Sequence, residues 1–178
     1  MALIPPGFRF YKAAITKAAA DAMLDPMLVA AVVWQESAFN TDAFRHEPNF
    51  WNRYLKHNPK YQALNPRRVS SSYGLMQVMY CLVHEDKLAD NDALPPEHLF
   101  VPELGLRTGC QFLASCLQWA IGRAEATTPE SRIIESALAA YNGGRSSDNA
   151  PSSPVLRNGT YAREVLAKLA ILRTATQF

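Results

Sequence analysis

A helical period that runs from Pro102 to about Ala124 constrains the fold more than any other feature of the sequence. Apolar residues within it recur at intervals of three and four, which places them on one face of an α-helix. They are Leu106, Cys110, Leu113, Leu117, Ala120 and Ile121. Because there is almost no strand pattern elsewhere, the sequence predicts a mainly α-helical chain.

Two further helices are predicted before this one. Residues 8–23 are rich in alanine with scattered lysines, a good helix-forming composition, and predict an N-terminal helix within residues 8–25. Asp25 then offers an N-cap, and Pro26 takes the first helical position. A second helix should therefore run from Pro26 to about Ser37.

The C-terminal part of the sequence shows the same signal for the start of a helix. Thr128 and Pro129 again pair a capping residue with proline, and the helix that follows should stop at Gly143 and Gly144. After a polar loop, Thr160 is expected to cap a last helix.

Residues 40–70 have a different character, with many aromatic, asparagine and proline residues and no long period. We predict an irregular segment with a short helix around Phe50–Lys56, followed in residues 70–88 by a turn that leads into a helix. Long irregular segments in compact domains are often functional. The aromatic residues of this insert could stack on sugars, but a small satellite core is the favoured interpretation; they are Phe44, Phe50, Trp51, Tyr54 and Tyr61.

The composition is that of one ordinary soluble domain, with 178 residues, 48% hydrophobic and 19% charged. A formal net charge of +2 is too small to indicate a nucleic-acid partner, and no apolar run is long enough to cross a bilayer. We therefore expect a single globular domain over residues 1–178, monomeric, without nucleic acid and without stable membrane insertion.

The first residues and the cysteines add two expectations. The start of the chain lacks the charged and then apolar pattern of a secretory signal, so we expect synthesis in the cytoplasm and delivery by another factor if the chain acts elsewhere. Cys81, Cys110 and Cys116 match no metal-binding spacing and are interpreted as core residues. No metal site and no cofactor are expected.

A carboxylate at the end of the second predicted helix is the first candidate for chemistry. Glu36 follows the apolar residues Val29, Val32 and Val33, so its carboxyl should be partly desolvated. Desolvation disfavours the charged form and raises the pKa of a carboxyl, which suits a general acid. The alternative is a partly exposed glutamate that only ends the helix.

Two short motifs later in the chain offer polar groups that suit a sugar. Gln77, in the stretch Ser72–Gln77, can both donate and accept hydrogen bonds and could orient an N-acetyl or hydroxyl group. Tyr141 and Asn142 stand where a predicted helix ends, and a tyrosine there could hold a carboxyl in place. Taken singly, the first motif more often belongs to a core beside a turn, and the second is equally compatible with a buried tyrosine before an Asn-Gly-Gly turn.

In this order, the motifs resemble the soluble lytic transglycosylase family, a catalytic domain of lysozyme-like fold that cleaves peptidoglycan. The motifs are Glu-Ser at the end of an apolar helix, Gly-Leu-Met-Gln, Ala-Tyr-Asn-Gly-Gly and a tyrosine that starts a terminal helix. The resemblance extends from about Asp25 to Leu172. It implies a mainly α, lysozyme-like fold with little or no sheet.

The resemblance also implies a reaction and a set of site residues. Glu36 would be the single acid and base in cleavage of the MurNAc-β-1,4-GlcNAc bond of a peptidoglycan glycan strand, leaving 1,6-anhydro-MurNAc ends. Tyr141 would support Glu36. The other implied substrate-binding residues are Ser37, Gln77, Asn142 and Tyr161.

The serines before the second motif often touch the sugar in this family, which makes Ser70, Ser71 and Ser72 candidates. Ser72 is taken into the predicted site, although the sequence leaves the choice among the three open. The separation of about 37 residues between Glu36 and Gly74 is longer than the family's usual spacing.

The segment Phe44–Trp51 within that insert resembles phage-encoded cell-wall lysins and adds a possible second carboxylate, Glu47. The delivery partner would be a holin, a virion or a secretion apparatus.

Two other functions fit the same residues. One is a hydrolytic lysozyme of the same fold, which would use Glu36 with a second carboxylate such as Glu47, since most glycoside hydrolases use two. Asp42, Glu85 and Asp86 are further candidates for that second group. The other is a non-catalytic murein-binding module of a virion, which would bind the strand without turnover.

Overall fold

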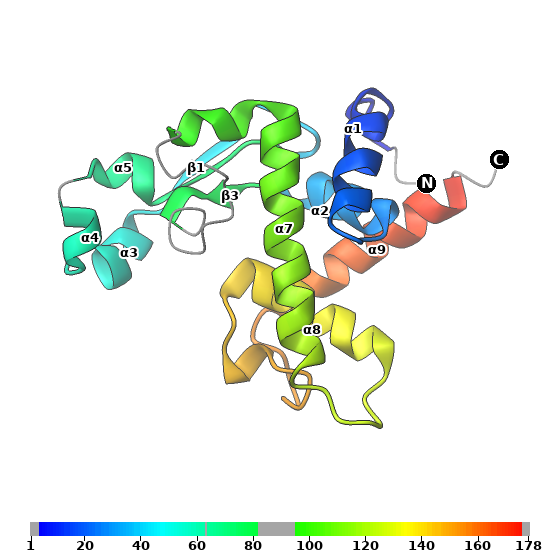
Figure 1. Cartoon of the computed structure of the whole chain (residues 1–178). Helices are drawn as coiled ribbons and strands as arrows, with labels where there is room; N and C mark the ends of the chain where they lie inside the picture. Colours follow the sequence, from blue (N-terminus) through cyan, green and yellow to red (C-terminus); the bar gives the residue numbers. More distant parts are fainter. Residues whose placement is uncertain (1–3, 63, 82–94, 176–178) are drawn as a thin grey trace.

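The computed structural model describes residues 4–62, 64–81 and 95–175, and helices dominate it (Figure 1). In chain order the helices and helical turns are α1 (Gly7–Asp21), α2 (Pro26–Ser37), α3 (Pro48–Phe50), the π-helix η1 (Trp51–Leu55), α4 (Pro59–Gln62), α5 (Pro66–Val69), η2 (Pro96–Phe100), α7 (Pro102–Ile121), α8 (Glu130–Gly143), η3 (Ser147–Asn149) and α9 (Gly159–Ala175). The three strands are β1 (Phe44–His46), β2 (Ser71–Tyr73) and β3 (Val78–Met79). The mainly α, lysozyme-like fold predicted from the sequence is confirmed.

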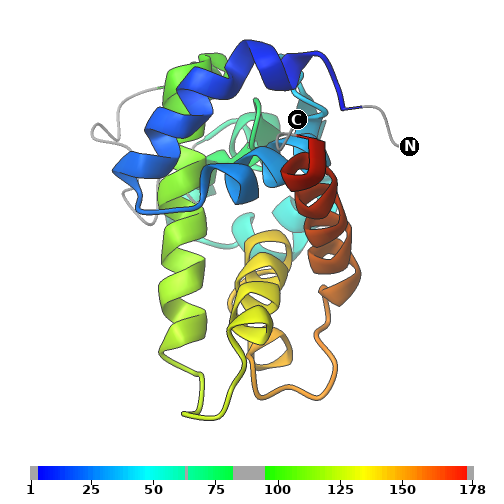
Figure 2. The same cartoon turned by 90° about the vertical axis from the view of Figure 1, so that its right-hand side faces the viewer.

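Helix α2 is the centre of the main core. Every residue from Leu28 to Val33 is buried, so the helix is apolar all round and must be enclosed by other elements. Helices α1 and α9 pack against it, and α1 also contacts α7. Figure 2 shows α8 between α7 and α9, which completes the helical body.

A small antiparallel sheet, in the order β1-β2-β3, lies beside this body. Arg45 stands opposite Ser72, and Tyr73 opposite Val78. The turn between β2 and β3 begins at Gly74, which has a φ of +71°. A Cβ added at Gly74 would lie 2.1 Å from the backbone oxygen of Leu99, so this turn needs glycine for both its conformation and its space.

The elements α3, η1, α4 and α5 form what we call the side lobe, which projects away from α1 and α9 (Figure 1). Its Leu55, Tyr61 and Val69 form an apolar cluster with Cys81, which follows β3, and this cluster is distinct from the main core. The predicted satellite core is therefore confirmed. The aromatic residues of the insert that belong to it are Tyr61, Phe50 and Trp51, whereas Tyr54 is 56% exposed and Phe44 packs edge-on against Tyr73.

Several predicted boundaries differ from those observed. Helix α1 ends at Asp21 rather than near residue 25, and α9 begins at Gly159, so Thr160 lies inside the helix that it was expected to cap. Pro129 rather than Thr128 is the N-cap of α8, because the Thr128 hydroxyl oxygen accepts the N–H of Glu125 instead.

Residues 70–79 were expected to form a turn leading into a helix, and they instead form the β2–β3 hairpin. Its strands are only two or three residues long, too short to show an alternating pattern in the sequence. In addition, β2 pairs with β1, which is far away in the sequence, so local sequence does not indicate this pairing. Most of the predicted helix that follows lies outside the described residues. Within the described residues, no helix combines the length and the apolar character that spanning a bilayer would require.

Candidate active site

Glu36 is the penultimate residue of α2, at the point where this buried helix emerges from the core. Directly after the helix, Ala38 and Phe39 have φ values of 50° and 66°, an unusual conformation for two residues that are not glycine. Phe39 is buried and its ring packs edge-on against Phe8, with ring centroids 6.0 Å apart. This packing holds the sharp reversal that leaves the Glu36 carboxyl at the helix end.

The surroundings of Glu36 act on its pKa in both directions. Burial raises the pKa above the ordinary value of a glutamate and is the largest influence. The Tyr161 hydroxyl donates a hydrogen bond to Oε1 of Glu36 over 2.5 Å, and this bond lowers the pKa, as does the charge of Arg45. The net result is a raised pKa, so Glu36 holds its proton more tightly than a carboxyl in water.

The two tyrosines differ from the roles predicted for them. Tyr161, from the first turn of α9, makes the hydrogen bond to Glu36 that was expected from Tyr141. Tyr141, near the end of α8, instead donates to the backbone oxygen of Met76 over 2.7 Å. Burial raises the pKa of both phenols well above the usual tyrosine value, so both remain protonated donors.

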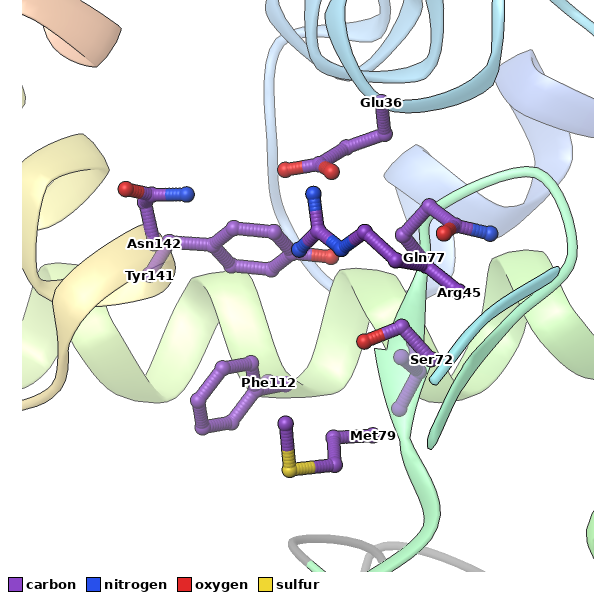
Figure 3. Close-up of a pocket in the computed structure, with 9 residues that line it drawn as sticks. Glu36, Arg45, Ser72, Gln77, Met79, Phe112, Tyr141 and Asn142 are labelled. Atoms are coloured by element: carbon purple, nitrogen blue, oxygen red, sulfur yellow. The ribbon is translucent and has the colours of Figure 1, made fainter. Parts of the chain in front are cut away.

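A cleft lies below the carboxyl of Glu36, between α2, α7, α8 and the sheet (Figure 3). Its lining residues are Glu36, Arg45, Ser72, Gln77, Val78, Met79, Phe112, Tyr141 and Asn142. Five of the predicted site residues are thus brought together from three separate parts of the chain: Glu36, Ser72, Gln77, Tyr141 and Asn142.

The structure distinguishes the three candidate serines. The hydroxyl groups of Ser70 and Ser71 donate to the backbone oxygens of Pro66 and Arg67 at the base of the side lobe. Ser72 points to the other face of β2 and lines the cleft.

Ser37 and Gln77 hold the turn between β2 and β3 against the end of α2. The Ser37 hydroxyl donates to the backbone oxygen of Leu75 over 2.8 Å, and Ser37 is not among the cleft-lining residues. The Gln77 amide nitrogen donates to the backbone oxygens of Ala43 and Gly74. Ser37 therefore lies under the turn rather than at the cleft surface where it was predicted.

Asn142 is anchored at the rim of the cleft by two other asparagines. Its side-chain oxygen accepts a hydrogen bond of 2.9 Å from Asn158. Asn158 is in turn bonded to Asn149, which is fully buried and also donates to the backbone oxygen of Ala139. This chain of amides ties the loop before α9 to the end of α8.

Glu47, the possible second carboxylate, is paired with Arg45. The distance between Glu47 Oε1 and Arg45 Nε is 2.5 Å, and Glu47 is not among the residues that line the cleft. Asp42 is exposed, whereas Glu85 and Asp86 lie outside the described residues. Within the lining of the cleft, Glu36 is therefore the sole carboxylate.

Four lining residues were not predicted: Arg45, Val78, Met79 and Phe112. Arg45 carries no local signal in the sequence, because its place in the cleft follows from the pairing of β1 with β2, which sets it opposite Ser72. Phe112 falls within the long helix, where an aromatic residue indicates packing rather than a cleft. Among the described residues, no group of three or more His, Cys, Asp or Glu side chains is placed to hold a metal ion.

Comparison with known families gives a match that covers most of the chain. The profile of the family described as "Transglycosylase SLT domain" matches residues 13–157, a range that contains α2, the sheet, α7 and α8. Comparison with curated proteins finds none that matches. The chain therefore belongs to the SLT transglycosylase family and is a lytic transglycosylase, an enzyme that acts on peptidoglycan.

Proposed function

We propose that this enzyme cleaves the β-1,4 bond between MurNAc and GlcNAc with Glu36 as its single general acid and base. The observation that carries the proposal is the isolation of Glu36. It is the one carboxylate among the lining residues, its pKa is raised by burial, and Tyr161 fixes the orientation of its carboxyl. A glycosidase that used water would be expected to present two carboxylates to the sugar.

In the first step, protonated Glu36 donates its proton to the oxygen that links the two sugars. The bond between C1 of MurNAc and that oxygen breaks, and GlcNAc leaves with the proton. The acetamido group of MurNAc stabilises the positive charge that develops at C1. A carboxyl with a raised pKa suits this step because more of it is protonated near neutral pH.

In the second step, ionised Glu36 accepts the proton of the C6 hydroxyl of the same MurNAc. The C6 oxygen then bonds to C1 and closes the 1,6-anhydro ring. Glu36 regains the proton that it gave, and no water is consumed.

The other lining residues would bind the sugars around this centre. Ser72 offers a hydroxyl group, and Asn142 offers an amide already oriented by Asn158. The amide nitrogen of Gln77 is bonded to the backbone, so its carbonyl oxygen is the part that can accept a hydrogen bond from a sugar. Phe112 and Tyr141 supply an apolar floor, with ring centroids 5.2 Å apart.

Replacement of Glu36 by glutamine tests the assignment. Glu36→Gln keeps the shape of the side chain and removes the transferable proton, so the rate of murein solubilisation should fall by at least ~10²–10⁴-fold. Glu125→Gln makes the same change at an exposed turn and should retain full activity. A Glu36→Gln enzyme that still clears a murein suspension would refute the proposal.

Mass spectrometry of the products tests the reaction type. The proposal expects muropeptides with anhydro ends, each lighter by one water than the hydrolysis product. Reducing ends, lost on Glu47→Gln substitution, would instead indicate the hydrolytic alternative. Binding of murein without any product would indicate the non-catalytic module.

The setting that we propose is release or delivery of the enzyme to the cell wall by a holin, a virion or a secretion apparatus. The resemblance of Phe44–Trp51 to phage cell-wall lysins supports a phage source. Expression in bacteria, with and without a separate agent that permeabilises the inner membrane, tests this. Lysis that depends on the agent is expected, and lysis without it would show that the enzyme reaches the wall unaided.

A further inference from the structure

Arg45 is a charged residue of the cleft that the proposed reaction does not use. It is the central residue of β1, opposite Ser72 in the sheet, and it lines the same cleft as Glu36. Figure 3 shows its guanidinium group turned toward Glu36 and Tyr141. Its side chain is 59% exposed, so a ligand in the cleft can reach it.

The position of Arg45 works against the first step of the reaction. A cation near Glu36 favours the carboxylate and lowers its pKa, whereas a general acid must hold its proton. Tyr161 already lowers the pKa of Glu36, and does so more strongly than Arg45, so the charge of Arg45 is not needed to keep the carboxylate form accessible. The remaining partner in the cleft is the substrate.

Glu47 holds Arg45 in a geometry that leaves donors free for such a partner. The ion pair joins Glu47 Oε1, directly after β1, to Nε of Arg45. A guanidinium has five N–H donors, so the two terminal nitrogens keep theirs. Among the described residues, no ion pair joins Arg45 to Glu36, although they share the cleft.

A carboxylate is the anion that suits the free nitrogens of Arg45, because a guanidinium can donate two parallel hydrogen bonds to the two oxygens of a carboxylate. In a strand of alternating GlcNAc and MurNAc, the sugar rings themselves are neutral. Only MurNAc carries an acidic substituent: the lactyl ether, whose carboxyl is either free or joined to a peptide that has carboxylates of its own. The charge in the cleft therefore matches the one anionic part of the strand.

We propose that Arg45 binds a carboxylate on the lactyl substituent of MurNAc, or on the peptide attached to it, and so determines specificity for muramyl strands. The proposal rests on the function proposed above. Glu47 acts as a positioning residue, since it keeps the guanidinium from collapsing onto Glu36.

Binding measurements in a Glu36→Gln background separate this proposal from the reaction itself. The ligands are soluble glycan fragments in two forms, with free lactyl groups or with attached peptides, each compared with a copy whose carboxylates have been converted to amides. The parent protein should bind at least one carboxylate form about twofold to fivefold more tightly than its amidated copy, as expected for a partly exposed charge pair. The form that shows the preference identifies the source of the carboxylate.

The decisive variant is Arg45→Gln combined with Glu47→Gln, which removes the ion pair without changing the net charge. It should bind each fragment and its amidated copy equally. The matched control is Arg68→Gln combined with Glu97→Gln, which removes an exposed ion pair of 2.7 Å outside the cleft lining and should keep the preference. Equal binding by the parent protein, a preference that survives in the Arg45 variant, or a preference lost in the control would each overturn the proposal.

Discussion

A single carboxyl can serve as both acid and base only if its pKa leaves both forms accessible. Burial alone would hold Glu36 in its protonated form, and the hydrogen bond from Tyr161 counters this by stabilising the carboxylate. The same bond restricts the rotation of the carboxyl. Tyr161 is therefore expected to tune the acid and to orient it.

Removal of the Tyr161 hydroxyl should move the pH profile in a defined direction. In Tyr161→Phe the carboxylate of Glu36 loses a donor, so the pKa of Glu36 rises and the alkaline limb of the kcat/KM profile moves to higher pH. The rate at the optimum should fall by about tenfold, since one net hydrogen bond to a charged group is worth about 1.5 kcal/mol. Initial rates on soluble glycan strands across pH provide the measurement.

Tyr141→Phe is the matched control for this prediction. Its hydroxyl bonds the backbone oxygen of Met76 rather than Glu36, so the alkaline limb should stay in place while stability decreases. The same shift in both variants would contradict the role assigned to Tyr161.

At the level of elements, the turn between β2 and β3 positions Ser72, Gln77 and Val78 in the cleft. Gly74→Ala should destabilise the protein by roughly 3 kcal/mol or more, because a left-handed φ and a clash with the backbone of Leu99 add together. Urea unfolding followed by circular dichroism measures the change.

Gly122→Ala provides the comparison at the end of α7. The φ of Gly122 is −65°, and the nearest atom to an added Cβ is 3.5 Å away, an ordinary contact distance. Its stability should change by less than about 1 kcal/mol. If both alanine variants behaved alike, the close approach of Leu99 to Gly74 would not matter.

The helices could be predicted from the sequence because their signals are local. Asp25 and Pro26 mark the start of α2, and the spacing of apolar residues identifies α7. The strands could not be predicted in this way, since β1 and β2 are short and pair across more than twenty residues of chain.

The sequence predicted which residues belong to the candidate site better than it predicted what each of them contacts. The motifs supplied Glu36, Ser72 and Gln77, all of which line the cleft. Which of the two tyrosines bonds Glu36 depends on how α8 and α9 pack around α2, and sequence order says nothing about that packing. For the same reason Ser37, adjacent to Glu36 in sequence, lies beneath the turn.

For the molecule as a whole, the raised pKa of Glu36 has a consequence for stability. A carboxyl whose pKa is higher in the folded than in the unfolded state favours folding most when it is protonated, and this contribution is lost as pH rises through the folded pKa. Glu36→Gln resembles the protonated form at every pH. It should therefore melt at a higher temperature than the native enzyme at pH 7, while the two should converge below about pH 4.

Thermal unfolding monitored by circular dichroism at several pH values tests this expectation. In a domain of this size, 1 kcal/mol corresponds to roughly 2–4 °C in Tm. Glu125→Gln, at its exposed turn, should show no such gain at pH 7. A Glu36→Gln protein that melted lower than the native enzyme at pH 7 would mean that burial does not penalise the carboxylate.

The side lobe closes its small apolar interior of Leu55, Tyr61 and Val69 with Cys81, which follows β3, and with the flanking Met79 and Tyr80. Tyr80 also packs against the main core, so the lobe shares apolar contacts with the scaffold. A foreign lobe inserted between β1 and β2 must therefore present an apolar face to these residues. Chimeras that do so should keep the melting behaviour of the scaffold, whereas chimeras with a polar face there should melt at a lower temperature.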